Sequence, residues 1–126
     1  MFKLKSTLIN STPVIEYMEG NAGETFKSGE ALVLSKGKLT KCSGANAPAF
    51  VCVGDVAGNS QGTSLVPVFR VTEHYIFSVP SVEGIDGLTI GDTVTLSDDG
   101  MGITAETDGG VAEIVALCGE TVSVKF

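Results

Sequence analysis

The chain has 126 residues, of which 43% are hydrophobic, and a formal net charge of −7. That length fits one domain, and no apolar run approaches the ~20 residues that a membrane span needs, so we expect no membrane partner. Residues 1–15 hold two lysines and no acid, whereas the remaining residues hold fifteen acids and six bases. Because an acidic body repels phosphate backbones, we also expect no direct nucleic-acid binding.

The first 20 residues predict an extended N-terminal arm followed by one strand. Pro13 lacks an N–H, so residues 14–18 are expected to start a new strand. The preceding dozen residues are rich in Ser, Thr and Asn, as is typical of a terminus that a partner orders. No secretory signal is readable, which predicts that the protein stays in the cytoplasm where it is made. We therefore divide the chain into the arm and first strand (1–20) and one β-domain (21–126).

The domain contains a degenerate internal duplication. Residues 28–40 recur as residues 90–104, and each copy has Gly followed by an acid, a short strand that ends in Leu-Ser, and a polar turn with Gly. This pattern predicts a β-hairpin in each of two units, at about 23–71 and 86–126, with a linking segment between them.

The two predicted hairpins can be placed by residue. The first has strands near 31–35 and 38–42, joined by Lys36-Gly37, a pair that favours a type I′ turn. The second has strands near 93–97 and 101–105. Alternation places Val94 and Leu96 inside and Thr95 outside, with Leu32 and Leu34 as the first unit's inward counterparts.

Further strands are predicted near 49–53, 64–71, 75–79, 113–117 and 120–126. Pro67 would put the strand at 64–71 at a sheet edge or a bulge. Scattered glycines argue against any helix longer than two turns. The predicted fold is all-β, a small antiparallel β-barrel or sandwich built from two hairpin-containing repeats.

No catalytic constellation is readable. The cysteines (Cys42, Cys52 and Cys118) lack zinc-ligand spacing and are interpreted as reduced core thiols, and the single histidine, His74, is interpreted as a surface residue. Asp98-Asp99-Gly100 lacks the other ligands of a calcium loop and is interpreted as a turn. We therefore expect no enzyme, no cofactor and no metal site.

A family resemblance rests on short, turn-rich motifs in residues 23–34, 51–58, 66–71, 77–80 and 91–94. They resemble the capsid decoration, or cement, proteins of tailed bacteriophages over roughly residues 20–126, although family members often have Gly where Arg70 or Val71 stands. The resemblance implies a non-enzymatic protein of the virion that binds the outside of the head, usually as a homotrimer, and reinforces the lattice of the major capsid protein.

The arm is the predicted capsid contact. Main-chain pairing with a neighbouring sheet would let its apolar side chains fill pockets while its lysines meet acidic capsid surface. The predicted contact residues are Phe2, Lys3, Leu4, Lys5, Leu8 and Ile9. A floppy terminus or an intramolecular edge strand is the competing interpretation of the arm.

Two other classes of function stay open at this stage. One is a small-molecule-binding or carrier-type β-domain, since Lys36 and Lys38 lie on a hairpin tip, although the methionines that usually flank a carrier lysine are missing. The other is a tail-tube or fibre module of a phage.

Overall fold

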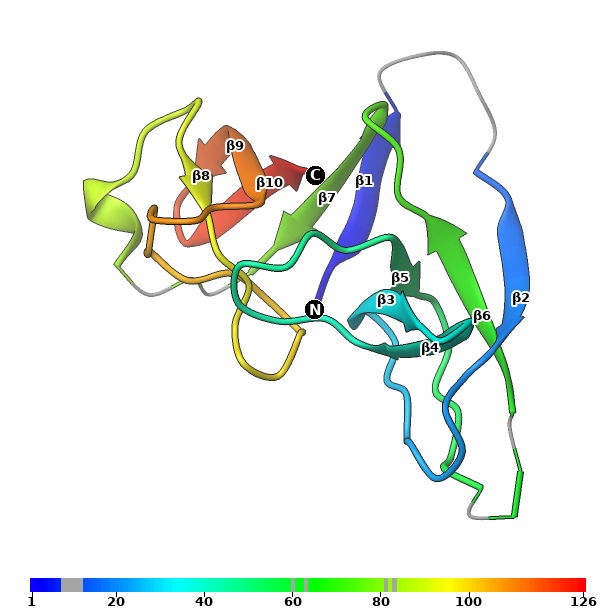
Figure 1. The fold of residues 1–126 in the computed structure, drawn as a ribbon. Helices are drawn as coiled ribbons and strands as arrows, with labels where there is room; N and C mark the ends of the chain where they lie inside the picture. The colour runs from blue at the N-terminus through cyan, green and yellow to red at the C-terminus, as the bar shows by residue number, and fades with distance from the viewer. Residues whose placement is uncertain (8–12, 60, 63, 81, 83) are drawn as a thin grey trace.

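A computed structural model describes residues 1–7, 13–59, 61–62, 64–80, 82 and 84–126, and it is all-β with two five-stranded antiparallel sheets. In one sheet the strand order is β2-β6-β5-β3-β4, and in the other it is β1-β7-β10-β9-β8. The two sheets lie side by side in a sandwich-like arrangement, and neither is closed into a barrel (Figure 1). The strands are β1 (Lys3–Thr7), β2 (Ile15–Glu19), β3 (Ala31–Ser35), β4 (Lys38–Lys41), β5 (Phe50–Cys52), β6 (Leu65–Arg70), β7 (Tyr75–Val79), β8 (Thr93–Val94), β9 (Ala112–Cys118) and β10 (Thr121–Lys125). The one helix of the described residues is a single 3-10 turn, η1 (Ile85–Gly87), so none is long and apolar enough to cross a membrane.

The duplication is visible in the strand order. Strands β2-β6-β5-β3 of one sheet correspond to strands β7-β10-β9-β8 of the other, with the same antiparallel pairings. We name β2 to β6 the first unit and β7 to β10 the second unit. The units therefore begin earlier than the sequence suggested, because β2 and β7 were predicted to lie outside them. Among the described residues, β1 has no counterpart in the first unit.

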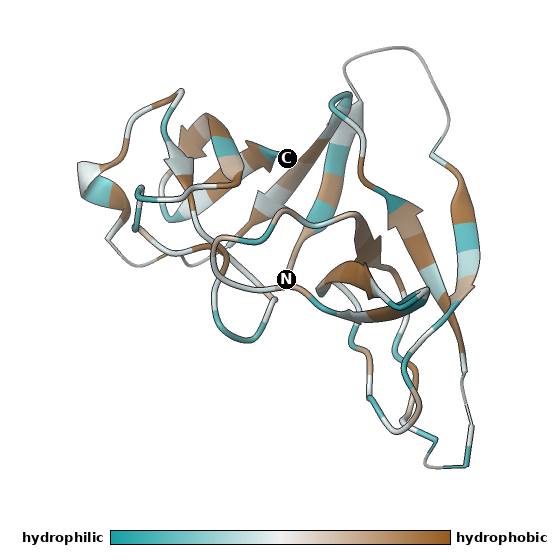
Figure 2. Ribbon diagram, in the orientation of Figure 1, coloured by the Kyte–Doolittle hydropathy of each residue, from teal (hydrophilic) through white to brown (hydrophobic). Residues whose placement is uncertain are grey.

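The buried residues repeat with the strands. Phe26, Leu32, Phe50 and Cys52 of the first unit recur at a constant offset as Leu88, Val94, Ala112 and Ile114 of the second. The first set lies in a small cluster within the curled sheet of the first unit, and the second set lies in a larger cluster that also receives Ala31, Cys42 and Val51 from the first unit. The larger cluster thus joins the two sheets, and Figure 2 shows apolar segments on strands of both.

The first predicted hairpin is confirmed, including its turn. Lys36 and Gly37 have φ values of 52° and 80°, which fits a type I′ turn because that turn needs positive φ at both central residues. Leu34, predicted to face inward, is exposed, because the hairpin extends beyond the core.

The second hairpin is less regular than predicted. Only Thr93–Val94 forms a strand of the sheet, and the pairing with residues 101–105 is reduced to an isolated bridge between Leu96 and Ile103. The hairpin keeps the hydrogen bonds from the Ser97 N–H to the Gly102 carbonyl (2.9 Å) and from the Thr104 N–H to the Thr95 carbonyl (3.0 Å), but the Thr95 N–H donates to Glu106 instead of Thr104, which interrupts the ladder. On its other side, Leu96 exchanges backbone hydrogen bonds of 2.8 and 3.1 Å with Gly44 of the first unit. Thr95, predicted to face solvent, is buried, and its hydroxyl lies 2.7 Å from that of Thr104.

Pro67 lies in an interior strand rather than at an edge. Its carbonyl accepts a hydrogen bond of 3.0 Å from the Val53 N–H, just past the end of β5 at Cys52. In an antiparallel ladder the N and O of one residue point to the same side. The nitrogen of Pro67 therefore faces a position where the neighbouring strand has ended, and its missing N–H costs no regular ladder bond.

The three cysteines differ in their exposure to solvent. Cys42 and Cys52 are buried, burial raises the pKa of each thiol, and their Sγ atoms donate to the carbonyls of Asn46 and Gly54. Cys118 is exposed at the end of β9, so its assignment to the core was wrong.

We expect a thiol reagent to label one cysteine quickly and two slowly in the native protein, because the reactive species is an accessible thiolate. Cys118→Ser should remove the fast phase; simultaneous native labelling of all three would contradict the structure.

Candidate functional site

The N-terminal segment is part of the domain rather than a free arm. β1 pairs antiparallel with β7, and the N–H of Phe2 donates to the carbonyl of Gly29 over 3.0 Å. Phe2 is only 3% exposed, and its ring packs edge-on against Phe126 at 5.3 Å between centroids. The prediction of a separate arm is therefore wrong for residues 2–7, because the apolar side chains that were to reach a partner bury in the chain's own core.

The predicted contact residues have different environments. Leu4 packs partly against the larger core cluster, and Lys5 donates from Nζ to the hydroxyl of Ser123 at 3.0 Å, while Lys3 is exposed. Leu8 and Ile9 lie outside the described residues. Among the predicted contacts that the structure describes, only the two lysines are presented on the surface as expected, and contact with a capsid stays a prediction for both.

A more conspicuous surface lies on the first unit, at the edge of β2. Sequence reasoning assigned these residues a strand but no role. Ile15 and Tyr17 point outward from β2, and their partners across the ladder are Phe69 and Pro67 of β6. The outer face of β2 and β6 is thus an apolar strip at a sheet edge, with three strongly exposed members: Ile15, Tyr17 and Leu65. Val14, just before β2, is also strongly exposed.

The charges of this edge are paired within the chain. The guanidinium of Arg70 forms two hydrogen bonds with the Glu16 carboxylate, at 2.9 and 3.0 Å, and holds the pKa of that carboxyl below its usual value. Glu19 is in ion-pair contact with Lys38. The Arg70–Glu16 pair is bidentate, the geometry in which an ion pair at the surface is strongest, so it holds these two side chains across β2 and β6.

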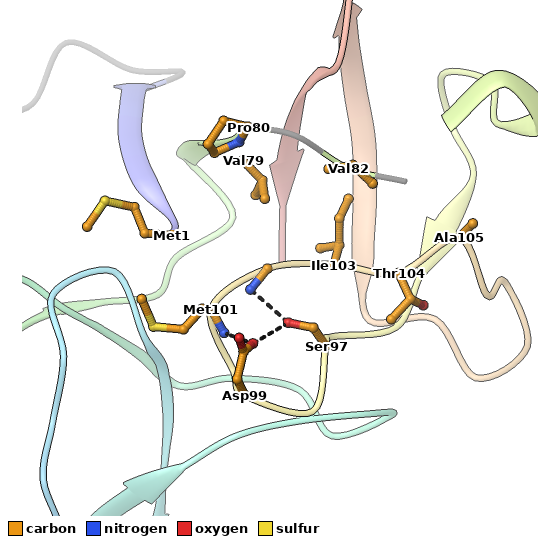
Figure 3. Close-up of a pocket in the computed structure, with 11 residues that line it drawn as sticks. Met1, Val79, Pro80, Val82, Ser97, Asp99, Met101, Ile103, Thr104 and Ala105 are labelled. Atoms are coloured by element: carbon orange, nitrogen blue, oxygen red, sulfur yellow. Dashed lines mark hydrogen bonds between the residues drawn. The ribbon is translucent and has the colours of Figure 1, made fainter. Parts of the chain in front are cut away.

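A cavity of about 540 Å³ lies where the N-terminus meets the second hairpin (Figure 3). Asp99 is fixed there by the Ser97 hydroxyl at 2.7 Å and the Met101 N–H at 2.9 Å, and these hydrogen bonds lower its pKa. Apolar side chains, among them Val79 and Met1, make up the opposite wall (Figure 3). The arrangement is that of a turn closed by its own aspartate, with no acid–base or nucleophile pair among the described residues that line it.

A neighbouring cavity of about 470 Å³ contains a buried carboxyl. Glu30 is only 6% exposed and its Oε1 has no hydrogen-bond partner in the described structure. Burial, reinforced by the negative charge of Glu24, raises the pKa of Glu30 to about 7. No three Asp, Glu, His or Cys residues among those described are placed to share a metal ion.

The comparisons with known proteins concern the fold. No family model and no curated protein matches this sequence. Among solved structures, the chain is similar to the head fiber gp8.5 N base of bacteriophage phi29, with a TM-score of 0.58 and 17% sequence identity. The likeness covers 90% of this chain and 94% of that one, so it extends over both units. The chain therefore shares its two-unit β fold with the base of a head fiber.

Proposed function

We propose that this chain is a structural protein of a phage virion that binds the outer surface of the head and reinforces the lattice of the major capsid protein. The observation that carries the proposal is the likeness over nearly the whole chain to the base of a phage head fiber. The family resemblance of the turn motifs supports the same role, as does an exposed apolar strip on a rigid sheet. Such a role needs shape and avidity and no catalytic group.

A homotrimer at three-fold positions of the shell is the expected assembly, and the family resemblance alone supports it. Many weak contacts, repeated over a lattice, add up to stable attachment even where each contact is weak. A narrower alternative is favoured by the fiber base itself: the chain would be the head-proximal base of a projecting fiber rather than a cement protein. Images of decorated heads separate the two roles, because a fiber projects and a cement protein lies flat.

The proposal is tested with heads that lack this chain. We expect the purified protein to sediment with such heads, to saturate at a fixed number of copies, and to raise the temperature at which the heads release DNA. Salt should weaken binding, since exposed lysines such as Lys3 contribute electrostatically. An absence of sedimentation at micromolar concentration, with folded protein and intact heads, would refute the proposal.

A further inference from the structure

The two units differ at one sheet edge. In the second unit, β1 lies along β7 and pairs with residues Tyr75–Ser78. In the first unit, the corresponding strand β2 is the last strand of its sheet, with β6 on one side. Figure 1 shows this difference: β1 lies beside β7, whereas β2 forms the outer border of the other sheet. Within the described chain, the first unit thus lacks the strand that completes the second.

The register shows which part of β2 is uncovered. Met18 pairs with Val66 and Val79 pairs with Val122, which are equivalent positions of β6 and β10. The β7 residues that β1 covers therefore correspond to residues 14–17 of the first unit. Beyond them the two edges of the sheet converge, because Gly20 bridges to Leu39 of β4. Of residues 14–17, the last three belong to β2 and Val14 directly precedes it.

The open segment carries the exposed apolar residues. Tyr17 of β2 is 67% exposed and Val14, just before the strand, is 66% exposed, whereas their equivalents in the second unit, Ser78 and Tyr75, are half-buried. An exposed edge with apolar side chains is a template for pairing with another strand, because its unpaired N–H and C=O groups add to those apolar contacts. The acidic residue between Ile15 and Tyr17 is Glu16.

We propose that residues 14–17 accept an extended segment of the shell protein as an added antiparallel strand, which occupies the position that β1 occupies in the second unit. The inference rests on the proposed function and names the attachment surface. The chemistry of the segment follows from β2: apolar side chains opposite Ile15 and Tyr17, and no acid opposite Glu16, whose carboxylate is already bound by Arg70. β1 supplies the position and direction of the added strand but not its side-chain order, because Leu4 lies opposite Phe77, the equivalent of Glu16, and Lys3 lies opposite Ser78, the equivalent of Tyr17.

The test combines two substitutions on the strip with a matched control. Ile15→Lys with Tyr17→Lys places charge on the edge, which blocks strand addition. Both side chains are exposed, so the thermal midpoint of the free protein should stay close to that of the wild type. Ile90→Lys is the control, because Ile90 is also 67% exposed but lies outside the strip. We expect the double variant to bind heads that lack this chain at least about tenfold more weakly, and the control to bind normally.

The outcomes separate the attachment surface from the role. If wild-type protein does not bind heads, the proposed function and the inference both fail. If all three proteins bind equally, the protein attaches by another surface and the inference alone is overturned. Sedimentation of the free proteins provides a further measurement. If the wild-type protein forms an oligomer and the double variant forms a smaller one, the strip is an interface between copies and not a shell site. If the double variant does not fold, Tyr17→Ser carries the same test.

Discussion

Phe2→Ala is expected to lower the free energy of unfolding by about 3 kcal/mol, since truncation of a buried aromatic side chain removes its contacts and leaves a cavity. The Phe2 ring is only 3% exposed, lies against Phe126, and belongs to the core cluster that joins the two sheets. The loss also loosens β1 from β7, because Phe2 anchors the start of that strand. Urea denaturation followed by far-UV CD measures the change, and the thermal midpoint should fall by roughly 10 °C.

Val14→Ala is the control for this experiment, because Val14 is a large apolar residue close to the same terminus but mostly exposed. It should change the free energy of unfolding by less than about 0.5 kcal/mol, as is usual for surface substitutions. A Phe2→Ala protein as stable as the control would mean that the N-terminal strand is not docked in solution. That result would support the interpretation of the N-terminal segment as a free arm.

The position of the N-terminal strand could not be settled from sequence. Alternation of Phe2, Lys3, Leu4 and Lys5 predicts a strand with one apolar face, but the same pattern fits pairing with the chain's own sheet or with a partner. The choice depends on whether an open edge and an apolar pocket exist elsewhere in the fold. Here the edge of β7 and the ring of Phe126 provide both.

The first hairpin was the most predictable part of the fold, because turn chemistry is local. Lys36-Gly37 determines its turn through the φ angles that it must adopt, whatever surrounds it. The burial of Leu96 and the exposure of Leu34 were not predictable, although the two residues occupy equivalent places in the two repeats. Leu96 is covered by the loop at Gly44, whereas no comparable loop covers Leu34. Equivalent sequence positions diverge wherever the two units contact each other.

The exposed edge at β2 was missed for a related reason. A Val-Ile-Glu-Tyr-Met run predicts a strand, but its apolar residues fit a core position as well as a surface strip. The structure distinguishes the two, since the inward side of β2 has Met18 against the smaller core cluster and the outward side has Tyr17 in solvent. Sequence reasoning likewise passed over Glu30, because the Gly-acid pair that marks each repeat was interpreted as turn punctuation.

Glu30→Gln is expected to flatten the pH dependence of stability between pH 5 and 8. The folded-state pKa of Glu30, about 7, lies above the ordinary glutamate pKa of 4.5, so between these pH values the folded protein retains a proton that the unfolded chain has released. The contribution of Glu30 to stability is therefore fully present below pH 4.5 and is lost as the pH rises through 7, because the buried carboxyl must then ionise without a hydrogen-bond partner at Oε1. Between pH 5 and pH 8, ionisation of Glu30 should lower the free energy of unfolding of the wild type by roughly 1 to 3 kcal/mol.

Urea midpoints of the two proteins at pH 5 and pH 8 measure the effect, and the difference between them isolates Glu30 from every other titrating group. Glutamine keeps the shape of the side chain and cannot ionise. The free energy of unfolding of the variant, relative to that of the wild type, should therefore rise by about 2 kcal/mol from pH 5 to pH 8. Glu120→Gln removes a carboxylate that is exposed, and it should show no such gain. A Glu30→Gln protein whose stability relative to the wild type is the same at both pH values would show that Glu30 is charged in the folded state already at pH 5. In that case Lys27 or Lys41, which line the same cavity, would have to reach its carboxylate and neutralise it.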